Sequence, residues 1–216
     1  MRRGRLGVEL DRRDFIRLTG VAAAFAMGAS GARGASKTID AKAIFDDPEA
    51  PVGGNPKGNI PVVAFLDYNC PYCRATAPDL KRFVASDGEI RLVYKDWPIL
   101  AISSVYGARL ALGANLQGRY QGAHDALMAV RGVKTTEATM REAVEAAGVD
   151  MGRLDSDLGA HDRAIMRLIK RNDDQAKALG LEGTPTYLVG PFLIAQPLNY
   201  EGFREAVQNF RQHLKK

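Results

Sequence analysis

The fold is decided by residues 61–73, which read PVVAFLDYNCPYC. The apolar first half is too short for a typical helix and predicts a strand that is buried on both faces. The polar residues after it predict a turn, and Pro71 suits the first turn of a helix, where its missing N–H has no partner to lose. We therefore expect Cys70 at a helix N-terminus and Cys73 one turn later on the same face.

Cys70 and Cys73 are the only cysteines among the 216 residues. A bridge that closes so small a loop removes little entropy from the unfolded chain, so the pair is not expected to be a structural staple. Unpaired backbone N–H groups and the positive end of the helix dipole favour a thiolate at Cys70. The pair therefore indicates redox chemistry, with two packing thiols or a Cu(I) ligand pair as alternatives.

Residues 1–35 have the pattern of an export signal. Arg12 and Arg13 form a twin-arginine pair, and the moderately apolar stretch 18–29 is shorter than the about 20 residues that span a membrane. Small residues follow, and we expect cleavage around residues 31–35 by a Tat-like route rather than Sec. This predicts a periplasmic or otherwise exported protein, where disulfides persist. A retained signal anchor is the alternative.

Most of the positive charge of the chain lies in this leader. Its seven arginines and three acidic residues give +4 of the formal net charge of +5. The remainder is almost neutral and carries no basic stripe with interleaved aromatic residues. We therefore expect no nucleic-acid partner.

Other polar and aromatic side chains have simpler explanations than catalysis. His124, His161 and His213 lack metal-ligand spacing, so we expect them on helix faces or at the surface and predict no metal site. Trp97 is expected to be a packing residue near the site. The basic cluster within residues 167–171 is expected to form a solvated helix face.

The rest of the chain predicts an interrupted α/β domain. Residues 36–60 are a lead-in segment of mostly turn-forming residues, with a short edge strand expected from Thr38 to Phe45. Residues 61–100 predict a strand, a helix and a strand, with the cysteines at the carboxyl end of the first strand, where α/β sites usually lie. Residues 101–180 predict helices, and residues 181–216 predict two strands and an amphipathic helix.

This arrangement resembles the DsbA-like branch of the thioredoxin-fold disulfide oxidoreductases. The resemblance covers nearly all of the chain after the leader and is carried by the motifs at residues 67–73 (DYNCPYC), Pro78, 95–98 (KDWP) and 183–186 (GTPT). It implies an α/β thioredoxin fold, in which a central mixed sheet is flanked by helices and residues 101–180 are an inserted helical subdomain.

The resemblance also implies a substrate groove. It places a cis peptide bond before Pro185, facing the cysteines, although trans would be the default for such a bond. The backbone of Thr184 is then expected to pair with an extended substrate peptide beside the active-site motif, which includes Pro71 and Tyr72.

The resemblance assigns different roles to the two thiols. Cys70 is expected to be the exposed attacking thiolate and Cys73 the buried resolving thiol. Relatives often place a glutamate six residues before the first cysteine to move the proton of the second, but this chain has Ala64 there. Either water, Asp67 or Lys95 is then expected to serve instead, or this proton transfer is slow. Asp67 is expected to cap the turn, with tuning of the thiol pKa as the functional alternative.

The sequence therefore predicts an exported protein disulfide oxidoreductase, in the first place an oxidase. An isomerase or reductase, or a copper(I)-binding thiol module, is the alternative. We expect no cofactor beyond the Cys70–Cys73 disulfide, protein substrates that carry thiols or disulfides, and a redox partner, membrane-bound or not, that recycles the pair. Because Tyr72 supplies no histidine cation, a weaker oxidant than members with histidine there is expected. The short lead-in segment favours a monomer.

Overall fold

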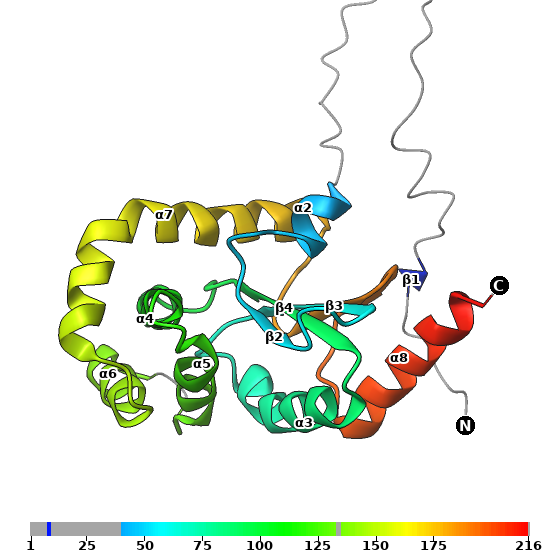
Figure 1. Ribbon diagram of the computed structural model, residues 1–216, viewed down its shortest axis with the longest axis horizontal. Coiled ribbons are helices and arrows are strands. Elements are labelled where there is room, and N and C mark those ends of the chain that lie inside the picture. The colour runs from blue at the N-terminus through cyan, green and yellow to red at the C-terminus, as the bar shows by residue number, and fades with distance from the viewer. Residues whose placement is uncertain (1–7, 10–39, 133–134, 216) are drawn as a thin grey trace, which may run out of the picture.

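The computed structural model describes residues 8–9, 40–132 and 135–215 (Figure 1). Six strands form one mixed sheet in the order β1-β6-β5-β3-β4-β2. Their bounds are β1 Val8–Glu9, β2 Val52–Gly54, β3 Ile60–Leu66, β4 Ile90–Asp96, β5 Thr186–Val189 and β6 Phe192–Ile194. Only β3 and β4 are paired in parallel, and every other neighbouring pair is antiparallel. The sheet therefore contains the predicted strand–helix–strand unit at its centre.

The helices cover both faces of the sheet and extend beyond one end of it. Their bounds are α2 Ala41–Phe45, α3 Pro71–Asp87, α4 Ile102–Asn115, α5 Tyr120–Ala129, α6 Glu137–Ala146, α7 Met151–Ala178 and α8 Tyr200–His213. Figure 1 shows α2 and part of α7 on one face, α3 and α8 on the other, and α4, α5 and α6 beside the sheet. The predicted mixed sheet flanked by helices, with a helical insertion, is confirmed.

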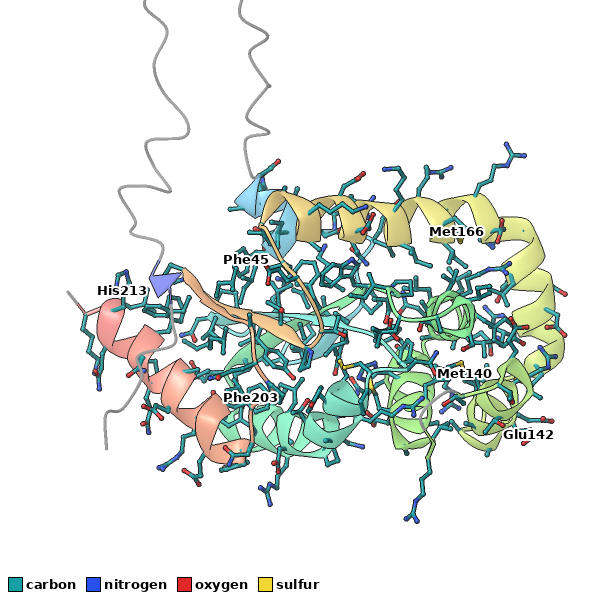
Figure 2. All side chains as sticks on the ribbon, turned by 180° about the vertical axis from the view of Figure 1, so that it is seen from behind. Phe45, Met140, Glu142, Met166, Phe203 and His213 are labelled. Atoms are coloured by element: carbon teal, nitrogen blue, oxygen red, sulfur yellow. The ribbon has the colours of Figure 1, made fainter. Side chains whose placement is uncertain are left out.

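Two apolar clusters lie on the two faces of the sheet. Alternation along β3 sends Phe65 into the cluster under α2 and α7, and Ala64 into the larger cluster that includes both cysteines. Figure 2 shows Phe45 and Phe203 on these opposite faces. The predicted both-face burial of this strand is therefore confirmed, and each of its side chains is assigned to one face.

The lead-in segment differs from the prediction. The edge strand expected from Thr38 to Phe45 is wrong, because Ala41–Phe45 forms helix α2, capped by the carboxylate of Asp40, which accepts the N–H of Ala43 at 3.1 Å. The edge strand is β2, in a stretch predicted as loop. A Cβ at Gly53 would lie 2.9 Å from Cε2 of Tyr94, so the close approach of β2 requires glycine there. Glycine has low strand propensity, which hid this strand in the sequence.

The helical insertion consists of α4 to α7, between β4 and β5. The last of these helices begins at Met151, where the carboxylate of Asp150 caps it and accepts the N–H of Arg153 at 3.0 Å. Among the described residues, no helix has the length and apolar character needed to cross a membrane. The predicted export signal lies outside the described residues except for Val8–Glu9, which pair with β6.

Candidate active site

Both cysteines lie where β3 passes into α3. Cys70 is the N-cap of α3, and its Sγ accepts the N–H of Cys73 at 3.4 Å. Pro71 follows in the first turn, as predicted. The helix continues through Pro78 to Asp87, so both thiols belong to one rigid element at the carboxyl end of a central strand.

The expected exposure of Cys70 is wrong. The residue is 2% exposed, and Cys73 is fully buried. The reason is the loop before β5, in which the carbonyl oxygen of Thr184 lies 3.1 Å from Sγ of Cys70. Tyr72, between the cysteines, is 62% exposed and is the part of the motif that faces solvent. A substrate would therefore meet Tyr72 before it reaches the sulfur.

The two thiols have opposite tendencies to ionise. A hydrogen bond from the Cys73 thiol, together with the Thr184 side chain and the backbone N–H groups of Tyr72 and Cys73, outweighs burial and lowers the pKa of Cys70 to about 6. Burial and the neighbouring Cys70 raise the pKa of Cys73. At neutral pH Cys70 is therefore the thiolate and Cys73 the protonated thiol.

The loop opposite the cysteines carries the other predicted groove residues. The peptide bond between Thr184 and Pro185 is cis, as the resemblance implied. The structure thus brings Pro71, Tyr72, Thr184 and Pro185 together around Cys70, although these segments are more than 100 residues apart in sequence. Their role in binding a substrate peptide stays a prediction.

Asp67 acts as a cap for two backbone segments. Its buried carboxylate accepts the N–H groups of Asn69 at 2.7 Å, Ile99 at 2.8 Å and Leu100 at 2.9 Å. The carboxylate therefore joins the turn before Cys70 to the loop after β4. This is the capping interpretation of Asp67; its role in thiol tuning stays a prediction.

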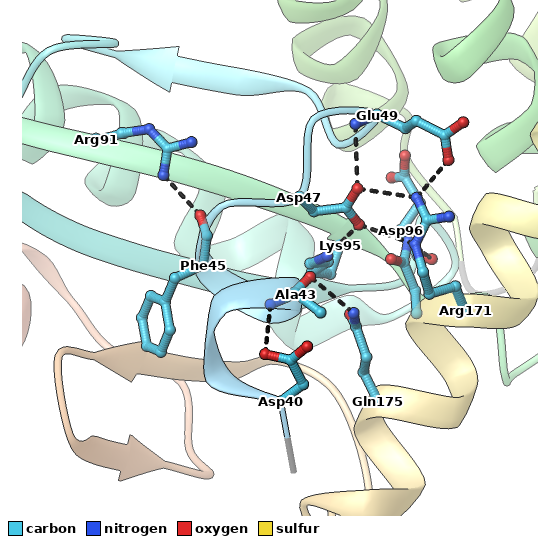
Figure 3. A network of polar contacts seen from close by, with 11 residues as sticks. Asp40, Ala43, Phe45, Asp47, Glu49, Arg91, Lys95, Asp96, Arg171 and Gln175 are labelled. Carbon is cyan, nitrogen blue, oxygen red and sulfur yellow. Dashed lines mark hydrogen bonds and ion pairs between the residues drawn. The ribbon is translucent and has the colours of Figure 1, made fainter. Parts of the chain in front are cut away.

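Lys95 does not reach the cysteines. Side chains alternate along β4, and Lys95 points to the face covered by α2 and α7, where its Nζ lies 2.7 Å from Oδ2 of Asp47. Figure 3 shows Asp47 between Lys95 and Arg171. The suggestion that Lys95 takes the proton of Cys73 is therefore wrong.

The position of Arg171 also differs from the prediction. The basic cluster at residues 167–171 was predicted to be a solvated face, yet Arg171 is half-buried and its Nη2 lies 2.9 Å from Asp47 and 2.7 Å from Glu49. Asp47 is itself buried. No local sequence pattern predicts these contacts, because the partners are 124 and 122 residues apart along the chain. Together they join α7 to the lead-in segment.

A buried polar network lies on the cysteine face of β4. The hydroxyl of Tyr120 donates to both carboxylate oxygens of Asp96 at 3.2 Å, and Tyr68 is hydrogen-bonded to Nδ1 of His124 at 3.0 Å. Burial raises the pKa of Asp96 to about 7 and lowers the pKa of His124 to about 4. His124 lies on a helix, as expected, but on its buried face, packed among tyrosine rings.

Arg74 is a residue of the site that the sequence interpretation missed. It follows Cys73 directly, and its guanidinium donates to the carbonyl oxygens of Tyr68 at 2.7 Å and Gly132 at 2.5 Å. It also contacts the side chains of Asn69 and Thr135. A cation beside a Cys-x-x-Cys motif was the available signal.

Trp97 packs at the opposite face of the sheet from the cysteines. Its ring lies edge-on to Phe65 with centroids 6.1 Å apart, and its Nε1 donates to Asp173 at 3.1 Å. The packing interpretation is confirmed, but the expected position near the site is wrong, because Trp97 lies in the cluster on the other face of the sheet. Within the described part of the chain, no three His, Cys, Asp or Glu side chains form a cluster that could hold a metal ion.

A parallel strand pair, a cysteine pair at the helix that follows it and a cis-proline loop against the first thiol together have the arrangement of a thioredoxin fold. The family model described as Thioredoxin matches residues 46–209, and the chain belongs to this family. The predicted resemblance to the DsbA-like branch is confirmed by this match and by the solved structures that the fold resembles.

Three solved structures illustrate that likeness. A thioredoxin-like oxidoreductase from Silicibacter pomeroyi is 37% identical, with a TM-score of 0.75 over 80% of this chain and 98% of that one. The thiol-disulfide exchange protein alpha-DsbA2 from Wolbachia pipientis is 26% identical, with a TM-score of 0.73 over 78% and 91% of the two chains. A periplasmic thioredoxin-like protein from Salmonella enterica serovar Typhimurium is 28% identical, with a TM-score of 0.68 over 78% and 93%.

Curated relatives of different length also match. The Na(+)/H(+) antiporter NhaA 3 of Salinispora tropica is 27% identical over 179 residues, which are 82% of this chain and 27% of that protein. The chain therefore spans about a quarter of the length of the curated relatives it matches.

Proposed function

We propose that this protein is an exported thiol:disulfide oxidase, which transfers the Cys70–Cys73 disulfide to other proteins. The observation that carries the proposal is the difference between the two thiols. The pKa of Cys70 is lowered to about 6, whereas burial raises that of Cys73. One sulfur is thus prepared to be a leaving group and the other to remain protonated once it is reduced.

The low pKa of Cys70 favours the oxidase direction. At pH 7 a thiol of pKa about 6 is about tenfold more often ionised than protonated, whereas an ordinary thiol of pKa about 8.5 is almost wholly protonated. This stabilises the reduced protein by about 1.4 kcal/mol, which makes the disulfide more oxidising by about 30 mV. The effect is moderate, which supports an oxidant between thioredoxin and the strongest members of the class.

The exchange proceeds in two steps that balance. A substrate thiolate attacks Sγ of Cys70, the Cys70–Cys73 bond breaks, and the sulfur of Cys73 takes both electrons of that bond and a proton from water. A second substrate thiolate then attacks the substrate sulfur of the mixed disulfide, and Cys70 leaves as a thiolate. The substrate has lost two electrons and gained a disulfide, and the protein holds two reduced thiols.

The surroundings of this reaction are part of the same proposal. The redox-active disulfide would act without a further cofactor, on proteins that carry thiols or disulfides. A separate redox partner, in the membrane or outside it, would restore the disulfide. The twin-arginine leader and the periplasmic description of the Salmonella structure support export. We propose a monomer that does not act on nucleic acid.

The proposal is tested by refolding a reduced, disulfide-containing protein with the oxidised enzyme. Cys70→Ser and Cys73→Ser are each expected to abolish formation of native disulfides, because neither variant can form the Cys70–Cys73 disulfide. Tyr72→Phe is the matched control, because it changes the motif without removing a sulfur. Refolding by Cys70→Ser at the rate of the parent protein would contradict the proposal.

The equilibrium with glutathione separates the alternatives within the class. A Cys70–Cys73 potential clearly above that of thioredoxin, about −270 mV, supports the oxidase, and a value at or below it would assign reduction instead. Faster recovery of a scrambled disulfide protein than of a reduced one would assign isomerisation. Tight Cu(I) binding by the reduced pair without any exchange activity would contradict the oxidoreductase and support the copper module.

A further inference from the structure

The side chain of Arg74 is held by four groups from two parts of the chain. Its Nε donates to the carbonyl of Tyr68 at 2.7 Å, and Nη1 donates to the carbonyl of Gly132 at 2.5 Å. Nη2 contacts Oδ1 of Asn69 at 3.4 Å and Oγ1 of Thr135. The planar guanidinium can make all of these contacts at once because its N–H groups point in fixed directions.

These four groups lie on both sides of the catalytic turn. Tyr68 and Asn69 belong to the turn that leads into Cys70, whereas Gly132 and Thr135 belong to the connection between α5 and α6. The guanidinium therefore joins the turn to the inserted helices. The thioredoxin part of the chain supplies the arginine, and the insertion supplies half of its partners.

Asn69 strengthens the same junction. Its Oδ1 accepts the N–H of Thr135 at 3.0 Å, and its Nδ2 donates to the hydroxyls of Ser103 and Ser104 at 2.9 and 3.0 Å. Asn69 is buried, so these bonds are made away from water. The residue directly before Cys70 is therefore fixed to two segments of the insertion.

The charge of Arg74 also acts on the thiols. Burial lowers the pKa of Arg74, and attraction to Asp67, Cys70 and Cys73 opposes that change. Attraction between two charges is mutual, so the same interaction stabilises the thiolate of Cys70. It adds to the hydrogen bond from the Cys73 thiol, which makes the larger contribution. Solvent screens a half-buried cation less than one at the surface.

We propose that Arg74 is a positioning residue that supplies the cation missing from the Pro71-Tyr72 dipeptide, and that the inserted helices hold it in place. It keeps the turn before Cys70 in one conformation and places a positive charge beside the thiolate. This role rests on the proposed oxidase function in one respect only, namely that a stable thiolate at Cys70 makes the disulfide more oxidising. It gives the helical insertion a direct part in setting the reactivity of the cysteines.

The test is the pH dependence of alkylation of Cys70 by iodoacetamide in the reduced full chain. Arg74→Gln is expected to move the midpoint of the rate–pH profile upward by about half a pH unit or more, which is about a threefold change in the ionisation constant. Arg74→Lys keeps the charge but has fewer donors, and is expected to restore most of the parent midpoint. The glutathione equilibrium of Arg74→Gln is expected to shift toward the disulfide by about the same factor.

Arg82→Gln is the matched control. Arg82 lies on the same helix, bonded to Asp79 and stacked over Tyr200, and its loss removes the same formal charge. Its profile is expected to match that of the parent protein. An unshifted midpoint in a folded Arg74→Gln protein, or an equal shift in Arg82→Gln, would overturn the proposal.

Thr135→Val tests whether the inserted helices hold Arg74 in place. It removes a hydroxyl contact of the guanidinium without changing the charge. A smaller upward shift than that of Arg74→Gln is expected, and no shift would show that the insertion does not hold Arg74 in place. Alkylation needs no protein substrate, so it tests the role of Arg74 separately from the oxidase function. If the parent protein fails to refold substrates but the alkylation midpoints shift as expected, the oxidase function is contradicted and the role of Arg74 is supported.

Discussion

Lys95 and Asp96 are neighbours on β4, and both are buried, yet they face opposite sides of the sheet in different company. Lys95 lies 2.7 Å from Asp47, which is also bonded to Arg171. Asp96 lies on the cysteine side and receives hydrogen bonds from the neutral hydroxyl of Tyr120. One face therefore holds paired charges and the other holds a carboxyl group among neutral partners.

The ionisation of the two carboxyl groups follows from this difference. Burial favours a higher pKa at Asp47, but Lys95 and Arg171 overcome it and hold that pKa below its usual value. At Asp96 burial prevails and raises the pKa to about 7. Asp47 is therefore ionised at neutral pH whereas Asp96 is still titrating there, because only one of the two sites supplies cations.

Removing a charge from the face that holds Lys95, Asp47 and Arg171 is expected to have the largest effect on stability. Asp47→Asn leaves the ammonium of Lys95 buried without a carboxylate, and the free energy of unfolding at pH 7 is expected to fall by about 3–5 kcal/mol in urea titration. The double variant Asp47→Leu with Lys95→Met, which removes both charges, is the control and is expected to recover most of the loss. A loss below 1 kcal/mol in Asp47→Asn would show that the pair is already hydrated.

On the cysteine face, Asp96→Asn is expected to change the pH dependence of stability. The folded pKa of Asp96 is raised, so its contribution is complete below about pH 4 and is lost as the pH rises to about 7. Relative to the parent, the variant is expected to gain up to about 4 kcal/mol between pH 4 and pH 8. Parallel stability–pH curves for the two proteins would contradict a raised pKa.

Tyr120→Phe tests the same difference between the two faces of the sheet and is expected to have a smaller effect on stability. It removes the donor to Asp96, and we expect a loss of about 1–3 kcal/mol together with a further rise in the pKa of Asp96. Because the pKa of the unfolded state is unchanged, the decline in stability should begin at the same pH and extend to a higher pH. Tyr94→Phe is the control, since its hydroxyl donates to Gln121 instead, and an identical displacement in that variant would exclude a specific Tyr120 effect.

The smallest effect is expected at the surface, beside the buried pair. Lys170 is one residue before Arg171 on α7 and forms an ion pair with Asp174 at 2.7 Å, with its side chain 70% exposed. Lys170→Gln is expected to cost about 0.5 kcal/mol or less, and the cost should vanish in concentrated salt. A cost as large as that of Asp47→Asn would mean that burial does not distinguish these pairs.

The central unit was accessible from local sequence signals. A short apolar run predicted β3, and a proline in the first turn predicted the start of α3, which ends at Gly88 with a φ of 74°. The helices of the insertion and the final strands followed from periodicity. The cis bond before Pro185 was implied by the resemblance alone, because no local signal separates cis from trans there.

The contacts between distant segments were not accessible in the same way. Propensity did not predict that glycine-rich β2 is a strand, and the loop that covers Cys70 comes from more than 100 residues later in the chain. Adjacent charged residues such as Lys95 and Asp96 have different partners because their side chains lie on opposite faces of the sheet. These differences depend on which segments pack together rather than on the segments themselves.

The sequence by itself determined the reaction class, since two cysteines at the start of a helix carry their chemistry in the local backbone: N–H groups, a dipole and a fixed spacing. Only the tertiary structure decided which groups surround those sulfurs, from the carbonyl of Thr184 to the guanidinium of Arg74, and which buried carboxyl group is charged. The reason is that hydrogen bonds and ion pairs in a folded chain depend on distance in space, and strand alternation and loop packing set that distance independently of separation along the sequence.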